Sequence, residues 1–300
     1  MSFRLAFVTL AIAVLMSWTG AVQADPPKAQ DTKDREVLRF GLAADTNVSR
    51  QDKTTTHWNT MIELGQRERL DFIVIAGDIV NNAKDQQQWD RLKSLLRKHR
   101  FKVETVPGNH EVRIIHEDRE DVFNRIYSLD RYEQATGVSV NRAFRYANAY
   151  FITFYSGGLE RGDTGWADFL KEHLAYANAD DSVDWVFVVD HLDPESISFP
   201  HAVPKFGGFD RAAIIEEAIA DQPNLVWLSG DRSSRYRQTV GEKTSPRAEF
   251  IPRENRSIPG FWRFELYADG RLTAQIVNTD TQKKHALIEV PPAQEASPTR

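Results

Sequence analysis

The sequence predicts an α/β protein in which a parallel-leaning sheet is followed by a β-rich part. Three apolar runs in the first half, residues 37–43, 71–76 and 101–106, have the composition of buried strands. A segment of helical periodicity separates each run from the next, which is the pattern of βαβ units and favours parallel pairing. Further strand-like segments close the chain, and we expect them to form a second sheet.

Two helices are expected between the first three strands. After a polar loop from Asp45 to Thr55, the first helix begins at about Thr56, which is a candidate N-cap residue. The second helix is expected near Asp85–His99, where apolar residues recur at helical spacing. Its Trp89 lies in this apolar stripe, and we interpret it as a core residue.

The later elements are shorter and partly aromatic. The stretch from Phe144 to Tyr155 alternates in polarity and predicts one or two antiparallel strands, broken near Asn148. The charged stretch from Glu117 to Gln134 is interpreted as a helical insertion. We expect further helices at 166–177 and 211–220, and further strands at 184–189, 225–228, 261–267, 272–277 and 285–290.

The N-terminus has the composition of a secretory signal peptide. Arg4 precedes an apolar run from Leu5 to Trp18, and small residues favour cleavage after Ala24. An uncleaved membrane anchor is the alternative, although the run is shorter than the roughly 20 residues that a membrane span needs. We therefore divide the chain into a signal peptide (1–24), a flexible linker (25–36), a folded domain (37–290) and a disordered tail (291–300).

The composition of the chain limits its cellular compartment and the kinds of catalytic or metal site that it can form. The net charge of −5 gives no indication of a nucleic-acid partner, and no later stretch is apolar enough to span a membrane. The chain has no cysteine, which excludes thiolate metal ligands and cysteine nucleophiles. Exported proteins without disulfides are common in the bacterial periplasm. We expect export to the periplasm or secretion.

Polar residues of the kind that bind metals follow each of the first three strands. The first strand runs into Asp45 and Asn47, the second into Gly77-Asp78, and the third into Gly108-Asn109-His110-Glu111. Each turn alone is also compatible with an ordinary strand-to-loop connection. Open α/β sheets keep their chemistry at the carboxyl ends of their strands, so three such ends in succession favour a metal site.

These motifs resemble those of the calcineurin-like metallophosphoesterase superfamily. The superfamily pattern is Asp-x-His, Gly-Asp, Gly-Asn-His-Asp/Glu, a lone His and Gly-His-x-His. The resemblance runs from about residue 37 to about residue 290 and implies a four-layer α/β/β/α sandwich. It implies that Asp78 bridges two divalent metals, that Asp45 binds the first metal, and that Asn109 and His191 bind the second.

The resemblance also implies the catalytic residues and the reaction. His110 would act beside the leaving group as an acid or electrostatic donor, and Glu111 would orient it. The implied activity is hydrolysis of a phosphomonoester or phosphodiester in a small phosphorylated substrate. Two alternatives remain open: a non-catalytic phosphate- or nucleotide-binding protein, and a structural protein with no ligand. The sequence carries no signal for the oligomeric state.

Two motifs depart from the superfamily pattern. Asn47, Asp231 and Ser233 stand where the pattern has ligand histidines. The second metal position keeps Asp78, Asn109 and His191, with Asp231 as an added oxygen, whereas the first position loses more. We therefore expect one divalent metal to be held and the other position to be weak or empty. Oxygen-rich ligand sets suit Mg²⁺, Mn²⁺ or Ca²⁺, but the sequence does not distinguish among Mn, Mg, Fe, Zn and Ca.

A basic run follows the altered last motif. Arg232 stands within Gly230-Asp231-Arg232-Ser233, and a guanidinium can bind phosphate through two hydrogen bonds. We therefore consider Arg232 as a substrate-binding residue. The alternative is a solvated strand face carrying several arginines.

Overall fold

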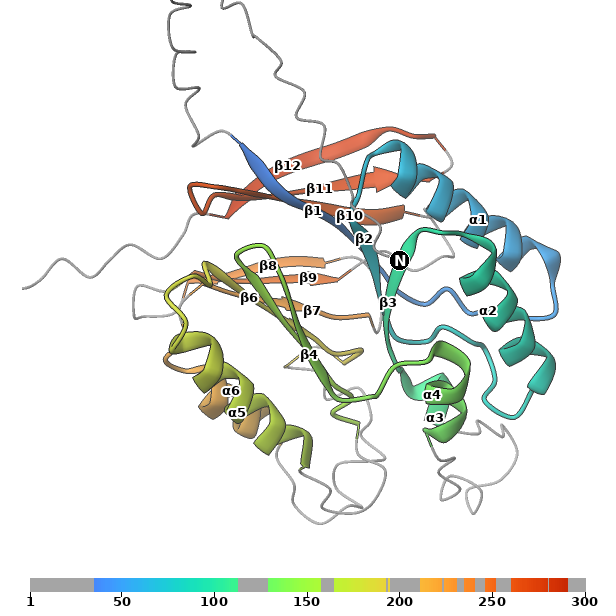
Figure 1. Cartoon of the computed structure of the whole chain (residues 1–300), viewed down its shortest axis with the longest axis horizontal. Coiled ribbons are helices and arrows are strands. Elements are labelled where there is room, and N and C mark those ends of the chain that lie inside the picture. Colours follow the sequence, from blue (N-terminus) through green and yellow to red (C-terminus); the bar gives the residue numbers. More distant parts are fainter. Residues whose placement is uncertain are drawn as a thin grey trace, which may run out of the picture.

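The computed structural model describes residues 35–112, 129–157, 165–192, 194, 211–222, 224–230, 235–240, 246–251, 260–279 and 281–290. The predicted signal peptide and tail, and most of the predicted linker, lie outside the described residues. The described chain forms two sheets that face each other, with helices on the outer face of each (Figure 1). This is the four-layer α/β/β/α arrangement that the resemblance implied.

The first sheet combines the N-terminal and C-terminal strands. Its order is β12-β11-β10-β1-β2-β3, with β1–β2–β3 parallel, as predicted, and the other pairs antiparallel. The strand bounds are Glu36–Ala43 (β1), Phe72–Ala76 (β2), Lys102–Val106 (β3), Gly260–Tyr267 (β10), Leu272–Asn278 (β11) and Lys284–Val290 (β12).

The expectation that the C-terminal strands form a separate sheet is wrong. Strand β10 pairs with β1 and places Phe264 opposite Phe40, with the two rings stacked at 4.8 Å between centroids. Phe40 also stacks on Phe72 of β2, at 5.4 Å. Side-chain alternation shows which face of a strand is apolar but not which strand lies beside it. The error therefore concerns pairing rather than the strands themselves.

The second sheet is built from the middle of the chain. Its order is β4-β5-β6-β7-β9-β8, and the predicted antiparallel pair at Phe144–Tyr155 is confirmed as β4 and β5. Strands β5, β6, β7 and β9 run parallel, and β8 and β9 were not predicted individually. The bounds are Arg142–Tyr146 (β4), Ala149–Thr153 (β5), Trp185–Val189 (β6), Leu225–Leu228 (β7), Arg235–Val240 (β8) and Pro246–Ile251 (β9).

Four helices lie at predicted positions, one of them with a displaced start, whereas the short helix α3 was not predicted. They span Asp52–Arg67 (α1), Gln86–Lys98 (α2), Asn109–Val112 (α3), Asp130–Thr136 (α4), Gly165–Asn178 (α5) and Arg211–Ile219 (α6). Helix α1 begins at Asp52, so Thr56 is not its N-cap; its hydroxyl instead donates to the carbonyl of Asp52 inside the helix. Of the insertion predicted at 117–134, the described residues contain α4 alone.

Three apolar clusters hold the layers together. One lies between the two sheets and contains aromatic rings from both, including Phe40 and Phe187 at 5.0 Å. Helices α1, α2 and α4 pack on the outer face of the first sheet, and Trp89 is buried there, which confirms its core role. Helices α5 and α6 pack on the outer face of the second sheet (Figure 1). Among the described helices, none has the length and apolarity to cross a membrane.

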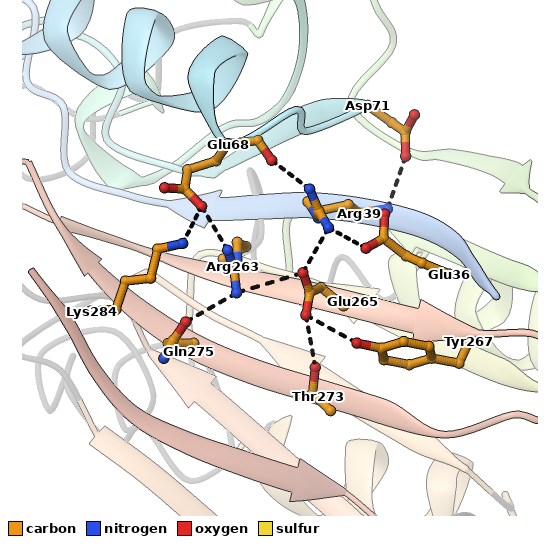
Figure 2. Close-up of polar contacts among 10 residues, drawn as sticks. All are labelled: Glu36, Arg39, Glu68, Asp71, Arg263, Glu265, Tyr267, Thr273, Gln275 and Lys284. Carbon is orange, nitrogen blue, oxygen red and sulfur yellow. Dashed lines mark hydrogen bonds and ion pairs between the residues drawn. The ribbon is translucent and has the colours of Figure 1, made fainter. Parts of the chain in front are cut away.

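Part of the first sheet's outer face carries charge instead of apolar side chains. Figure 2 shows an outer-face network on β1, β10, β11, β12 and the end of α1. Arg263 contacts Glu68 at 2.6 Å and Gln275 at 3.0 Å, and Arg39 contacts Glu265 at 3.0 Å. The network comprises Glu36, Arg39, Glu68, Asp71, Arg263, Glu265, Tyr267, Thr273, Gln275 and Lys284.

Candidate metal centre

The carboxyl ends of β1, β2 and β3 bring the predicted ligands of the first sheet together. The parallel register pairs Ala43 with Ile75 and Ala76 with Val106, so the three strands end at the same edge. Beyond the strands, the N–H of Asp45 donates to Gly77 O at 3.1 Å, and the N–H of Asn47 donates to Asp78 O at 2.9 Å. These bonds continue the pairing past the sheet and hold the ligand-bearing turns side by side.

The backbone at these turns has an unusual conformation. Asp45, Asn47 and Asp78 have φ angles of 51°, 43° and 50°, in the left-handed region. Aspartate and asparagine tolerate this region better than most residues, and such conformations cluster at functional sites. The left-handed turns redirect the chain shortly after β1 and β2. They thereby place the carboxylates of Asp45 and Asp78 at the edge of the sheet.

The second sheet contributes His191, which follows the end of β6. Its imidazole is fully buried, and Nδ1 lies 2.9 Å from the carbonyl oxygen of Ala76 in the first sheet. A carbonyl only accepts hydrogen bonds, so Nδ1 carries the hydrogen. Nε2 points the other way, 3.1 Å from Asn109 Oδ1 and 3.3 Å from Asp78 Oδ1.

These side chains form a compact donor set. Ligand atoms of Asp45, Asp78 and His191 lie within 4.8 Å of one another. The Oδ1 atom of Asn109 adds a neutral oxygen beside Nε2 of His191. The side-chain oxygen of Asn47 is also buried and has no hydrogen-bond partner among the described residues. Carboxylate and amide oxygens with one imidazole fit a divalent cation that prefers oxygen ligands.

The electrostatics of the centre favour a cation. Burial alone would raise the pKa of Asp78, but the charge and hydrogen bond of His191 and the contacts of His110 lower it. Burial alone would lower the pKa of His191, but the carboxylates of Asp78 and Asp45 raise it well above its ordinary value. The carboxylates thus attract positive charge into the centre, and a metal competes with a proton for Nε2 of His191.

Glycine makes this close approach possible. A Cβ atom at Gly108 would lie 2.3 Å from both the backbone nitrogen and Oδ1 of Asp78. A Cβ atom at Gly77, whose φ is 81°, would lie 2.3 Å from Nδ1 of His191. Any other residue at these positions would displace a ligand, so both glycines are structural parts of the centre.

Comparisons with known proteins agree with this geometry. The family model for calcineurin-like phosphoesterases matches residues 38–214. The chain belongs to the calcineurin-like phosphoesterase family. Its members are hydrolases that act on phosphoester bonds and use divalent metal ions. The donor set of Asp45, Asp78 and His191 lies at the sequence motifs on which the resemblance to this family rests. No curated protein sequence matches the chain.

Solved structures show the same fold at low sequence identity. A purple acid phosphatase from yellow lupin (Lupinus luteus) seeds aligns with a TM-score of 0.64 and 12% identity, over 84% of this chain and 53% of its own. A dimetal phosphatase from Danio rerio aligns with a TM-score of 0.59 and 14% identity, over 87% of this chain and 100% of its own. GAP50, the anchor in the inner membrane complex of Plasmodium, has the same TM-score and identity, over 87% and 91%.

Within this phosphoesterase fold, Glu111 has a different contact from the one that the resemblance implied. Its carboxylate is buried and accepts hydrogen bonds from the N–H groups of Val80, at 2.8 Å, and Gly108, at 2.6 Å. Burial, together with the charge of Asp78, raises the pKa of Glu111 to about 7. Glu111 therefore does not orient His110 through a hydrogen bond; it ties the turn after β2 to the turn after β3.

His110 is oriented by the backbone instead. Its Nδ1 lies 2.8 Å from the carbonyl oxygen of Asn81, and its backbone N–H donates to Asp78 Oδ1 at 2.9 Å. Nε2 lies 3.7 Å from Asp78 Oδ2, and the side chain is 25% exposed. The imidazole therefore borders the candidate metal ligands and also reaches solvent.

The altered last motif is only partly described. Asp231 and Arg232, predicted as a metal ligand and a substrate-binding residue, lie outside the described residues, as does Ser233. Gly230, directly before them, donates its N–H to His191 O at 2.9 Å. A Cβ atom on Gly230 would lie 1.8 Å from Ala76 O, so the chain enters this motif in close contact with the centre.

One polar cluster beside the centre was missed by the sequence analysis. Ser156, Asp190 and Arg211 are buried and bonded to one another next to His191. They come from the end of β5, the end of β6 and the start of α6. Separations of 21 to 55 residues leave no motif by which the sequence could have linked them.

Proposed function

We propose that this protein hydrolyses a phosphomonoester or phosphodiester with one firmly held divalent metal ion, at a site depleted relative to the superfamily pattern. The observation that supports the proposal is the convergence of Asp45, Asp78 and His191, with ligand atoms within 4.8 Å of one another. A divalent cation held there supplies Lewis-acid catalysis, polarising a phosphoryl oxygen and activating water. In this proposal Asp78, Asn109 and His191 hold the firm position, with Asp231 as a further ligand. Asp45 belongs to the depleted position.

The remaining residues have roles that follow from their contacts. His110 reaches solvent beside Asp78, and we assign it proton donation to the leaving oxygen. Glu111 holds the two ligand-bearing turns together through the N–H groups of Val80 and Gly108. We retain Arg232 as a residue that binds the substrate phosphate, and Asn47 as a weak ligand of the depleted position. The N-terminal sequence supports export to the periplasm or secretion, with cleavage after Ala24.

The metal content of the purified protein tests this proposal directly. We expect elemental analysis after loading with mixed divalent metals to give about one firmly held metal per chain in the wild type and none in Asp78→Ala. Asp168→Ala, which changes an exposed aspartate on α5, is the matched control and should keep the metal. Two firmly held metals per chain would contradict the depleted site, and no metal in the wild type would contradict the enzyme.

Activity separates hydrolysis from binding. With p-nitrophenyl phosphate and bis(p-nitrophenyl) phosphate as probes, we expect turnover that falls by roughly 100-fold or more in His110→Ala, because general acid catalysis contributes on that order. A chain that holds metal and phosphate without turnover would instead support the non-catalytic binding protein.

A further inference from the structure

The side chains next to His191 form a buried polar cluster, here called the Asp190–Arg211 cluster (Ser156, Asp190 and Arg211). Asp190 and His191 are fully buried, and the side chain of Arg211 is 9% exposed. Buried ionic groups need partners at good geometry, because their desolvation is costly. A cluster of this kind directly beside a proposed metal ligand therefore needs an explanation.

Arg211 makes several bonds at once from a single guanidinium. Its Nη2 lies 2.8 Å from Asp190 Oδ2 and 3.1 Å from the carbonyl oxygen of Leu192. Its Nε donates to Ser156 Oγ at 2.5 Å, and Ser156 in turn donates to Asp190 Oδ2. The planar fork of arginine suits such simultaneous contacts, whereas lysine offers a single point charge.

These bonds hold the residues on both sides of His191. On one side the carboxylate of Asp190 is fixed, and on the other side the carbonyl of Leu192. The carbonyl of His191 itself accepts from Gly230 N at 2.9 Å. The imidazole is thereby directed out of the second sheet toward Ala76 of the first sheet. The proposed ligands Asp45, Asp78 and Asn109 lie on turns of the first sheet. Among the described residues, those turns are bonded to one another and not to the Asp190–Arg211 cluster.

We propose that Arg211 is a positioning residue for the metal centre: through Asp190 and Leu192 it fixes His191 in the orientation that makes Nε2 a ligand. The inference rests on the metal centre of the proposed function. Arg211 touches neither substrate nor metal in this scheme. Its effect passes through the peptide that carries His191.

Metal affinity in the full chain tests the inference. We expect Arg211→Lys, which keeps the charge but loses the fork, to weaken Mn²⁺ binding by about 10- to 100-fold, as is typical for residues that orient ligands. Ser156→Ala removes one bond of the cluster at smaller cost to folding and should weaken binding several-fold. Mn²⁺ titration followed by electron paramagnetic resonance measures both, and the thermal midpoint of the metal-free protein reports folding.

The outer-face network supplies a matched control. Arg263 has a side chain 12% exposed and contacts Glu68 at 2.6 Å and Gln275 at 3.0 Å, none of them metal ligands (Figure 2). Arg263→Lys should lower the thermal midpoint but leave Mn²⁺ affinity unchanged. Equal affinity in Arg211→Lys and Arg263→Lys would overturn the inference. If Arg211→Lys does not fold, unchanged affinity in Ser156→Ala overturns it.

A second readout separates this inference from the proposed function. In metal-free protein, the ¹⁵N resonances of the His191 ring report the Nδ1 hydrogen bond to Ala76. We expect them to shift in Arg211→Lys and Ser156→Ala and to stay in place in Arg263→Lys. If the wild type binds no Mn²⁺, the proposed function fails, and the ring resonances still decide whether Arg211 positions His191.

Discussion

The metal centre and the outer-face network are both rich in charge, but their charges are arranged differently. In the network, the basic side chains of Arg39, Arg263 and Lys284 contact neighbouring carboxylates, and Lys284 is 40% exposed (Figure 2). In the centre, Asp78 and Glu111 are buried, and their described partners are imidazoles and backbone N–H groups. The basic side chains of the network contact its own carboxylates, whereas the centre is suited to an external cation.

This difference shows that a cluster of charges is not by itself a sign of function. In the outer-face network, each of the basic side chains of Arg39, Arg263 and Lys284 contacts a carboxylate. The centre has turns with positive φ, glycines that leave no room for a Cβ atom, and ligand atoms that converge. Three predictions test this contrast, in order of decreasing effect on stability.

Gly108→Ala should be the most damaging change. The added Cβ would meet the backbone nitrogen and Oδ1 of Asp78 at 2.3 Å, and a backbone atom cannot yield as a flexible side chain can. We expect a loss of about 3 kcal/mol in the free energy of unfolding, at the upper end for overpacking, and loss of metal binding. Chemical denaturation and Mn²⁺ titration measure the two effects.

Gly137→Ala is the control for the glycine prediction. Gly137 follows α4 with φ 76° and has no atom within 4 Å of an added Cβ, so strain of the left-handed backbone is its main cost. We expect about 1 kcal/mol of destabilisation and unchanged metal affinity. Equal loss of metal binding in both variants would show that the packing at Gly108 is not specific to the centre.

Glu111→Gln should have an intermediate effect. The substitution keeps the shape but replaces one acceptor oxygen by an N–H₂ group, which then faces the N–H of either Val80 or Gly108. We expect about 2 kcal/mol of destabilisation from the unsatisfied donors, and weaker metal binding because the two turns separate. A stable variant with wild-type metal affinity would remove the linking role that we assign to Glu111.

The outer-face network should give the smallest effect, and one that depends on pH. Burial would raise the pKa of Glu68, but hydrogen bonds and charges from Lys284 and Arg263 outweigh it and lower the pKa below its ordinary value of 4.5. A lowered folded-state pKa stabilises the protein above the unfolded value, and this stabilisation is lost as the pH falls through the folded-state pKa.

Glu68→Gln should therefore cost less than about 1 kcal/mol at pH 7 and less still below pH 4. Urea denaturation at several pH values measures this difference, with Asp168→Ala as a control for an exposed carboxylate. A cost above that of Gly108→Ala would reverse the contrast between the two regions.

Much of the centre could be predicted from the sequence because its parts are local. Each ligand of the first sheet directly follows an apolar strand, and parallel strands place their carboxyl ends at one edge, so Asp45, Asp78 and Asn109 converge once the strands are recognised. His191 follows the same rule at the end of β6. The βαβ alternation and the buried Trp89 are local signals of the same kind.

Tertiary structure alone decided the rest, because those features depend on contacts between distant segments. Three contacts join residues that share no sequence pattern. They are the pairing of β10 with β1, the hydrogen bond from the N–H of Val80 to Glu111, and the bonds of Arg211 to Asp190 and Ser156. Periodicity determines which face of an element is apolar, and a motif determines which side chains are present. Which elements become neighbours is determined by the packing of the two sheets, which depends on the whole chain at once.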